Sequence, residues 1–330
     1  MTVPVTYGIR LPNSGPFASP DALRGIATHA EALGFDTIWV HDHLAWPTHR
    51  RTHFAAGSVE AVTDQRPDFY ESLSTLAYLA GMTRRVRIGV AGLVLPWRDP
   101  RALAKQLATI DAMSGGRLIA GLAIGRFKDE FDAQQVPHNR RGRITDEYMA
   151  CLHAILGPAA VTEFHGELVT IEGAEYFPKS RGLAIWVCGQ SPQAHRRVAR
   201  FARGWLPGGS VAEYAENTKA LAAVLADAGR SLDEIERGVE IFTAVAGTDA
   251  AAHDIARASL VHQSGDVARG AERSLVGRPA TVAGRMREYV AAGVTHFELK
   301  FICHTIEAMK EMMRTYAEAI VPKVSEGARW

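Results

Sequence analysis

Cysteine is scarce in this sequence: Cys151, Cys188 and Cys303 are the only three among 330 residues. They lie far apart along the chain and match none of the spacings that place cysteines around a zinc ion. The sequence therefore predicts no metal site built on thiolates. We interpret the three as reduced thiols, as expected in a cytoplasmic protein.

The chain also lacks an excess of either charge. Its formal net charge is +1, which gives no electrostatic argument for binding nucleic acid or an anionic membrane surface. No apolar run approaches the roughly 18 residues that a membrane span needs. The first residues, MTVPVTYGIR, contain no basic region followed by an apolar stretch, so no signal peptide is predicted. We expect neither a nucleic-acid nor a membrane partner.

A glycine-rich phosphate-binding turn of the G-x-G-x-x-G type is missing after the first strand. Gly89, Gly121 and Gly125 are separate glycines that do not form this motif. Because that motif opens dinucleotide-binding sheets, an open Rossmann-type fold is disfavoured.

What the sequence does contain is the composition of an ordinary globular protein, 47% hydrophobic and 22% charged. Strand-like and helix-like segments alternate, which is typical of βαβ units on a parallel sheet. Strands are predicted at residues 5–11, 35–40, 86–95, 117–125, 184–189, 204–206, 239–246 and 294–301. Helices are predicted at residues 20–33, 69–80, 99–113, 145–156, 193–201, 211–228, 281–292 and 306–321. Since eight parallel strands close a barrel, we predict an α/β protein built as a single (β/α)8 TIM barrel over residues 1–330.

Several insertions interrupt this alternation. Residues 45–68, after the second strand, are polar and aperiodic, and a loop of this length is typical of a lid, although a plain surface insertion is also compatible. Residues 126–143, after the fourth strand, are charged and irregular. Residues 157–182, before the fifth strand, predict a small hairpin, and residues 265–278 predict a loop.

The first candidate for chemistry is the end of the second strand. Residues 35–40 are aromatic and β-branched, and His41, Asp42 and His43 follow directly. Strand carboxyl ends are where parallel α/β proteins build their sites, so the three ionisable side chains are expected in one. The alternative is that they are loop and capping residues without a chemical role.

Many short segments of the chain, in register, resemble one known family. They are 8–12 (GIRLP), 39–43 (WVHDH), 85–89 (RVRIG), 105–111 (KQLATID), 114–117 (SGGR), 130–131 (EF), 135–137 (QVP), 141–143 (RGR), 146–147 (DE), 164–167 (FHGE), 184–191 (AIWVCGQS) and 276–297. On these residues the chain resembles the luciferase-like flavin and deazaflavin oxidoreductases, which are TIM barrels, and is most similar to the members that use coenzyme F420. Arg126 and Cys188 depart from the family pattern, which usually has Trp and Gly there.

The resemblance implies roles for the end of the second strand. It implies that His43 is the catalytic acid–base residue, since imidazole readily exchanges a proton near neutral pH. Asp42 would assist it by fixing its tautomer, and His41 and Trp46 would contact the cofactor. The alternatives are a capping role for Asp42 and loop packing for Trp46.

The resemblance also implies the remaining cofactor contacts. The family has a non-proline cis peptide at the end of the third strand, and the matching bond is Gly92–Leu93. Phosphate recognition would come from the loops after strands four and five, at helix N-termini. The residues implied there are Gly125, Arg126, Gly189, Gln190 and Ser191. Tight barrel packing of Gly92 and a solvated Arg126 are the alternatives.

Three functions are compatible with these residues. The first is hydride transfer between coenzyme F420 and a small organic substrate, in which the basic residues Arg126, Lys128, Arg140, Arg141 and Arg143 meet the anionic tail of the cofactor. The second is an FMN-dependent monooxygenase served by a partner flavin reductase, and the third is a non-catalytic flavin-binding homologue. A metal hydrolase is disfavoured, because its His-x-His would end the first strand. The sequence leaves the substrate and a homodimer open.

Overall fold

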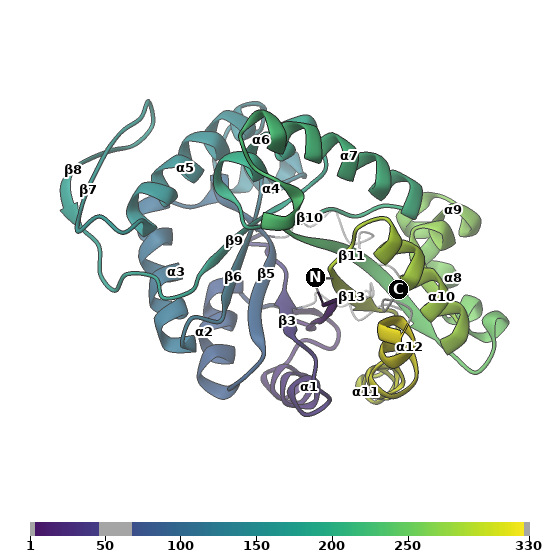
Figure 1. Cartoon of the computed structure of the whole chain (residues 1–330). Coiled ribbons are helices and arrows are strands. Elements are labelled where there is room, and N and C mark those ends of the chain that lie inside the picture. Colours follow the sequence, from purple (N-terminus) through teal and green to yellow (C-terminus); the bar gives the residue numbers. More distant parts are fainter. Residues whose placement is uncertain (1–3, 46–67, 327–330) are drawn as a thin grey trace.

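Eight parallel strands close into a barrel in the computed structural model, which describes residues 4–45 and 68–326. They are β1 (Thr6–Arg10), β3 (Thr37–Val40), β5 (Arg87–Val94), β6 (Leu118–Ala123), β9 (Ala184–Cys188), β10 (Gly204–Leu206), β11 (Glu236–Val245) and β13 (His296–Phe301). Their order around the barrel follows the sequence, and the pairings of β13 with β1 and of β10 with β11 close it. Figure 1 shows the strands at the centre with helices around them. The predicted TIM barrel is confirmed.

Helices connect the strands and cover the outside of the barrel. The longer ones are α1 (Pro20–Ala32), α2 (Ser72–Met82), α3 (Pro100–Ser114), α5 (Arg141–Leu156), α6 (Pro192–Phe201), α7 (Val211–Asp227), α8 (Asp249–Ser264), α10 (Pro279–Ala291) and α11 (Ile306–Thr315). Their starts follow ordinary capping chemistry: Ser19 Oγ accepts a hydrogen bond from the first turn of α1 at 3.0 Å, and Asp99 Oδ1 accepts one from that of α3 at 2.8 Å. Gly115 ends α3 with φ 75°, which glycine adopts without steric cost.

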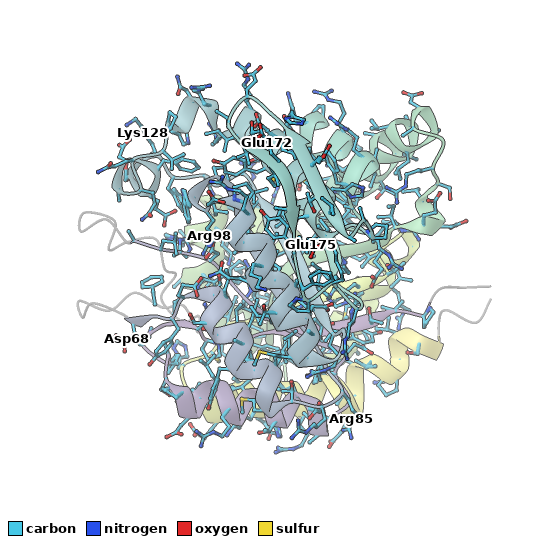
Figure 2. All side chains as sticks on the ribbon, turned by 90° about the vertical axis from the view of Figure 1, so that its left-hand side faces the viewer. Asp68, Arg85, Arg98, Lys128, Glu172 and Glu175 are labelled. Carbon is cyan, nitrogen blue, oxygen red and sulfur yellow. The ribbon has the colours of Figure 1, made fainter. Side chains whose placement is uncertain are left out.

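Shorter elements fill the connections. They are β2 (Ser14–Gly15), β4 (Asp68–Phe69), η1 (Leu95–Trp97), α4 (Lys128–Ala133), η2 (His138–Arg140), β7 (Val161–His165), β8 (Thr170–Glu175), η3 (Leu232–Glu234), α9 (Val267–Glu272), β12 (Ser274–Gly277), η4 (Tyr316–Ile320) and α12 (Val321–Glu326). The predicted hairpin before the fifth barrel strand is confirmed, since β7 and β8 pair antiparallel. It lies outside the barrel, and Figure 2 views it from the front, with Glu172 and Glu175 on β8.

The structure corrects three predicted segments. Residues 126–143 contain α4 and η2, and α5 begins earlier than predicted. The predicted loop 265–278 contains α9 and β12, and β12 pairs with the carboxyl half of β11, beyond the part that pairs with β10. Four residues are too few to show an alternation, so the sequence does not indicate β12. Phe69 lies in β4, which pairs with β2, and α2 starts only at Ser72.

Aromatic side chains fill the barrel interior around Trp39 and Trp186, whose ring centroids lie 5.5 Å apart. His296 completes the group at 5.4 Å from Trp186, and accepts a hydrogen bond from Trp39 Nε1 at 3.1 Å. Gly8 and Gly89 face the Trp39 indole so closely that a Cβ would overlap with it. The interior is therefore packed, and an open site is left only at an end of the barrel.

Cys151, Cys188 and Cys303 are free cysteines, and Cys151 and Cys303 are buried. Within residues 4–45 and 68–326, no helix has the length and apolar character needed to cross a membrane.

Candidate functional site

A pocket of about 390 Å³ opens at the carboxyl end of the barrel. Side chains and backbone from β1, β5, β6, β9, β11 and β13 line it, together with the residues that follow β3. Figure 2 shows this end by Arg98, which follows β5, and Lys128, which follows β6, while Arg85 before β5 lies on the opposite side. The pocket therefore occupies the position where parallel barrels build sites.

The pocket brings together six of the predicted site residues and leaves out four. Those that line it are His41, Asp42, His43, Gly92, Gly125 and Arg126. Those that do not are Leu93, Gly189, Gln190 and Ser191. Trp46 lies outside the described residues.

His43 pairs with a carboxylate that comes from α4. Its Nδ1 lies 2.6 Å from Glu130 Oε1, and the Glu130 side chain is only 2% exposed. A carboxylate at Nδ1 favours the tautomer protonated there, in which Nε2 is the basic nitrogen. The ring is also packed edge-on against Phe69, with centroids 5.8 Å apart. His43 is thus an oriented imidazole at the pocket wall.

Asp42 does not take the role predicted for it, because its carboxylate is bound elsewhere. Arg98 donates two hydrogen bonds to it, each 2.7 Å long, one to each oxygen. Ser72 Oγ donates a third at 2.9 Å and the backbone N–H of Val94 a fourth at 2.9 Å. Asp42 therefore joins β3 to β5 and α2, and within residues 4–45 and 68–326 the carboxylate found at His43 is that of Glu130.

His41 is buried in the pocket wall and is held as a neutral ring. Burial, and then the charge of Arg10, lower the pKa of His41 well below its ordinary value. Its Nε2 lies 2.6 Å from Ser14 Oγ, and Asn13 bonds both its backbone N–H and its carbonyl. The residue is rigidly placed.

The floor of the pocket carries charged residues that the sequence reasoning did not nominate. Arg10 Nε donates to Glu298 Oε1 at 2.5 Å, and its Nη2 donates to the Ala91 carbonyl at 2.9 Å. Arg10 Nη2 also lies 3.7 Å from Glu240 Oε2, and Lys300 Nζ forms an ion pair with Glu240 Oε1. Burial raises the pKa of Glu298 to about 7, against the opposing effect of Arg10. The sequence feature that could have identified these residues is a charged side chain within a strand that is otherwise apolar.

The cis peptide bond in the wall formed by β5 lies one bond earlier in the chain than predicted. The cis bond is Ala91–Gly92, and not Gly92–Leu93. The pairing of β5 with β6 shifts register between Ala91 and Leu93, so Gly92 is the bulged residue that faces the pocket. Leu93 instead packs in the core, fully buried. A resemblance aligned through short motifs does not fix where a one-residue bulge lies.

The predicted phosphate contacts fall into two groups. Gly125, with φ 77°, and Arg126 line the pocket. Ser191 instead caps α6, where its Oγ accepts from Ala194 N at 3.2 Å, and the Gly189 carbonyl accepts from Trp205 Nε1 at 2.7 Å. Gln190 is exposed. After β9, the Ser191 side chain and the Gly189 carbonyl thus make local contacts.

Two of the basic residues assigned to an anionic tail have acidic partners. Lys128 pairs with Asp132 at 2.6 Å, and Arg143 pairs with Glu167. Arg140 is exposed after α4. Cys188, the other departure from the family pattern, lines the pocket, and burial raises the pKa of its thiol well above the ordinary range. That thiol is therefore a poor nucleophile.

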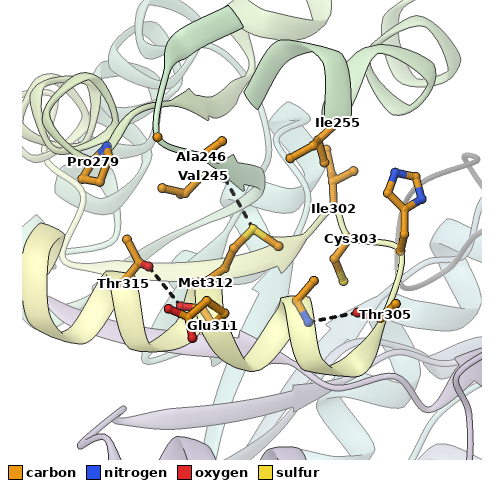
Figure 3. A pocket seen from close by; sticks show the side chains of 13 residues that line it. Val245, Ala246, Ile255, Pro279, Ile302, Cys303, Thr305, Glu311, Met312 and Thr315 are labelled. Atoms are coloured by element: carbon orange, nitrogen blue, oxygen red, sulfur yellow. Dashed lines mark hydrogen bonds between the residues drawn. The ribbon is translucent and has the colours of Figure 1, made fainter. Parts of the chain in front are cut away.

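A larger pocket of about 550 Å³ lies beside the barrel, lined by residues of α8, α11 and the segments that follow β11 and β13. Figure 3 shows Val245, Ile255, Ile302 and Met312 around it, so most of its lining is apolar. It contains none of the predicted site residues. Among residues 4–45 and 68–326, no group of three or more His, Cys, Asp or Glu side chains is arranged to hold a metal ion. Cys303, His304 and Glu311 are the ionisable residues in the lining of the larger pocket. The smaller pocket has more of them, namely Arg10, His41, Asp42, His43, Arg126, Glu130, Cys188, Glu240 and Lys300.

Comparison with solved structures supports the fold. An F420-dependent secondary alcohol dehydrogenase, solved with an F420–acetone adduct, superposes with a TM-score of 0.80 at 16% identity, over 97% of this chain and 99% of that one. The monooxygenase RslO1 from Streptomyces bottropensis superposes with a TM-score of 0.78 at 21% identity, over 96% and 99%. At these identities the likeness shows the barrel alone.

Comparison with curated sequences and with a family model bears on the family of this chain as well as on its fold. An uncharacterised protein of Mycobacterium bovis is 30% identical over 189 residues, which are 56% of this chain and 64% of that protein. The match thus spans less than two thirds of that relative's length. The family model described as luciferase-like monooxygenase matches residues 5–296, in agreement with the resemblance found in the sequence motifs. The chain belongs to the luciferase-like monooxygenase family.

Proposed function

We propose that this protein is an oxidoreductase that binds coenzyme F420 in the pocket at the barrel mouth and transfers hydride to or from a small organic substrate. The observation that carries the proposal is the pair of His43 Nδ1 and Glu130 Oε1, 2.6 Å apart at the pocket wall. Hydride addition to a carbonyl carbon leaves an oxygen that needs a proton, and hydride removal from an alcohol releases one. An imidazole whose Nδ1 is held by a carboxylate can give or take that proton at Nε2.

The wall of the pocket fits a flat ring system. A Cβ on Gly92 would lie 2.8 Å from Ala123 Cβ and 3.0 Å from Cys188 Sγ, so glycine leaves a smooth surface there. Gly125, on the neighbouring strand end, is confined in the same way by Phe131 and Val94. A bound flavin or deazaflavin would supply the hydride chemistry, while the residues of the chain position the substrate and move the proton.

The preference for F420 over FMN rests on the acid–base pair and on the solved relatives. A hydride step that makes or uses an alcohol needs a proton, which His43 is placed to exchange. One solved relative with this barrel is an F420-dependent dehydrogenase. Arg126 at the pocket and Arg140 nearby in sequence remain candidates for the anionic tail. A non-catalytic binding protein would have no use for the oriented His43–Glu130 pair.

An FMN-dependent monooxygenase, supplied with reduced FMN by a partner reductase, is the second candidate. It is supported by the description of the family and by the monooxygenase RslO1, which has the same barrel. Both cofactors carry a flat tricyclic ring with the same pyrimidinedione end, so the pocket geometry admits either.

A titration of the purified apoprotein with F420 and, separately, with FMN tests the choice. Quenching of tryptophan fluorescence reports binding, and Trp97 packs in one cluster with Phe131, at 5.6 Å between ring centroids, and with Val94, which lines the pocket. We expect F420 to bind more tightly than FMN, with an affinity that falls as salt screens the contacts of its anionic tail. Tight FMN binding without F420 binding would replace the proposal by the monooxygenase.

A further inference from the structure

The floor of the pocket presents three charged groups in a fixed order. Lys300 Nζ forms an ion pair with Glu240 Oε1, and the other oxygen of the same carboxylate, Oε2, lies 3.7 Å from Arg10 Nη2. All three residues line the pocket. Across the floor the groups therefore run cation, carboxylate, cation, which in hydrogen-bonding terms is donor, acceptor, donor.

The order is held rigidly from behind. Glu298, whose side chain is fully buried, fixes the Arg10 guanidinium through Nε at 2.5 Å, and the Ala91 carbonyl fixes Nη2 at 2.9 Å. The Arg10 side chain is 7% exposed and that of Lys300 12%, whereas Glu240 is 32% exposed. Lys300 Nζ also lies over the Phe242 ring, 4.8 Å from its centroid. The carboxylate in the middle is therefore the group of the floor most open to the pocket.

Burying this row of charged groups costs free energy unless the groups have bonding partners. Moving charges out of water is offset only when they are paired and hydrogen-bonded, and apolar residues of similar size often fill such a place at no loss of stability. Since these groups line a pocket that opens at the barrel mouth, a ligand with a complementary polar edge explains the arrangement.

The pyrimidinedione end of a flavin or deazaflavin ring has that edge. It offers a carbonyl acceptor, an N3–H donor and a second carbonyl acceptor in a row. We propose, on the basis of the function proposed above, that Lys300, Glu240 and Arg10 bind this edge, with the Glu240 carboxylate accepting the N3–H hydrogen bond. A carboxylate has about four acceptor sites, so Glu240 can serve the ring while it stays paired with Lys300.

This assignment fixes which end of the ring enters the pocket first. The pyrimidinedione edge meets the floor, and the side chain that carries the phosphate leaves toward solvent. FMN and F420 share this edge, so the floor recognises both and does not choose between them. Selection between FMN and F420 therefore depends on contacts with the cofactor's tail and on the chemistry at His43.

The test uses two ligands that differ at one atom of that edge. The first is the 5-deazaflavin nucleoside, which is the ring and sugar-alcohol part of F420 without its phosphate, and the second is its N3-methyl derivative. The methyl group removes the donor and adds bulk facing Glu240. We expect the wild-type protein to bind the methylated ring at least about tenfold more weakly, which is the scale of one lost hydrogen bond to a charged group. Fluorescence of the ligand reports the binding.

Two variants complete the comparison. Glu240→Ala should bring the two affinities to within about twofold of each other, because the acceptor is gone and the methyl group has room. Glu236→Ala is the matched control, since Glu236 lies on the same strand and pairs with Arg87 at 2.6 Å, away from the pocket lining. It should keep the wild-type ratio.

Different outcomes contradict the assignment of Glu240 and the proposed binding of a deazaflavin, on which that assignment rests. Equal binding of the two rings by the wild-type protein overturns the assignment of Glu240, while binding of the unmodified ring still supports a deazaflavin site. A Glu240→Ala variant that keeps the wild-type ratio also overturns the assignment. No binding of either ring by the wild-type protein contradicts the proposed function itself. Equal binding of the two rings by the wild-type protein overturns the assignment even if Glu240→Ala fails to fold.

Discussion

His43 and Glu130 form a pair whose members have different tasks. The imidazole reaches the pocket wall and exchanges the proton, whereas Glu130 is buried at 2% exposure and acts through the ring that it orients. Glu130 is therefore a positioning residue in this account. Asp42, which lies next to His43 in sequence, is instead held by Arg98 and Ser72.

The two tasks predict non-additive effects on turnover. His43→Ala should lower kcat by about 10²–10⁴, as expected for a lost acid–base group, with little change in the affinity for F420. Glu130→Gln should cost less, and the double variant should be no slower than His43→Ala, because Glu130 acts only through the imidazole. Steady-state kinetics and cofactor titration measure these effects. Asp132→Asn, exposed on the same helix, should change neither, and additive losses in the double variant would contradict the pairing.

His296 predicts how the stability of the fold depends on pH. Burial lowers the pKa of His296 from 6.5 to about 3. Between these values the unfolded chain binds a proton that the folded protein does not, so stability falls as pH drops from about 6.5 toward 3, by at most about 1.4 kcal/mol per pH unit. Relative to wild type, His296→Gln should therefore flatten the loss of stability between pH 6.5 and 4.5, as measured by urea unfolding.

Glu298 predicts a pH dependence of stability that is opposite in sign to that of His296. The pKa of Glu298 is raised from 4.5 to about 7, so the folded protein holds a proton that the unfolded chain releases, and this contribution is lost as pH rises from about 4.5 to 7. Glu298→Gln should remove that decline while leaving the acid side unchanged. Identical pH profiles for both variants and the wild-type protein would show that neither group is perturbed in the folded state.

At the scale of elements, the end of β5 shapes the pocket. The strand shifts register around Gly92, and the two neighbours nearest to a Cβ placed there are Ala123 on β6 and Cys188 on β9. Three strand ends thus meet at a position where only a hydrogen atom fits comfortably. A ring bound there would lie against backbone, which is where glycine allows the closest approach.

Gly92→Val should therefore abolish cofactor binding, because the added carbons have to displace β6 or β9 or occupy the pocket. Gly81→Ala in α2 is the matched control, since a Cβ there meets nothing within 4 Å. It should bind cofactor normally and gain up to about 1 kcal/mol in stability from helix propensity. Affinity is measured by titration and folding by thermal unfolding. Unchanged affinity in Gly92→Val would exclude this wall as the ring site.

Elements that depend on local sequence could be predicted, and those that depend on distant partners could not. The strand predicted at 35–40, which the structure has at Thr37–Val40, and the ionisable residues that follow it are local features, and His41, Asp42 and His43 line the pocket. Glu130 is 87 positions from His43, and it lies in a helix within a stretch that reads as irregular. Arg10 and Glu298 are 288 positions apart, and each looks like an isolated charge until the barrel closes. Such pairs form only because the barrel topology brings distant strands together, and the residue pattern of a single strand carries no information about that.

At the scale of the whole molecule, the barrel divides its interior into a packed part and an open part. Trp39, Trp186 and His296 fill the interior, and the charged floor of Arg10, Glu240 and Lys300 lines the pocket at the carboxyl end. Eight strand ends converge there, so residues from the whole length of the chain can meet in one site. The alternation of strands and helices predicted this convergence, but not which side chains would take part.

A crystal structure of the complex with F420 tests the central claim most directly. We expect the ring in the barrel-mouth pocket, with its pyrimidinedione edge on Glu240 and with His43 beside its reactive face. The competing location is the larger apolar pocket beside α8 and α11, which has the volume for a ring but does not contain the His43–Glu130 pair. A ring bound there, or one in the barrel mouth turned with its tail toward Glu240, would contradict the account.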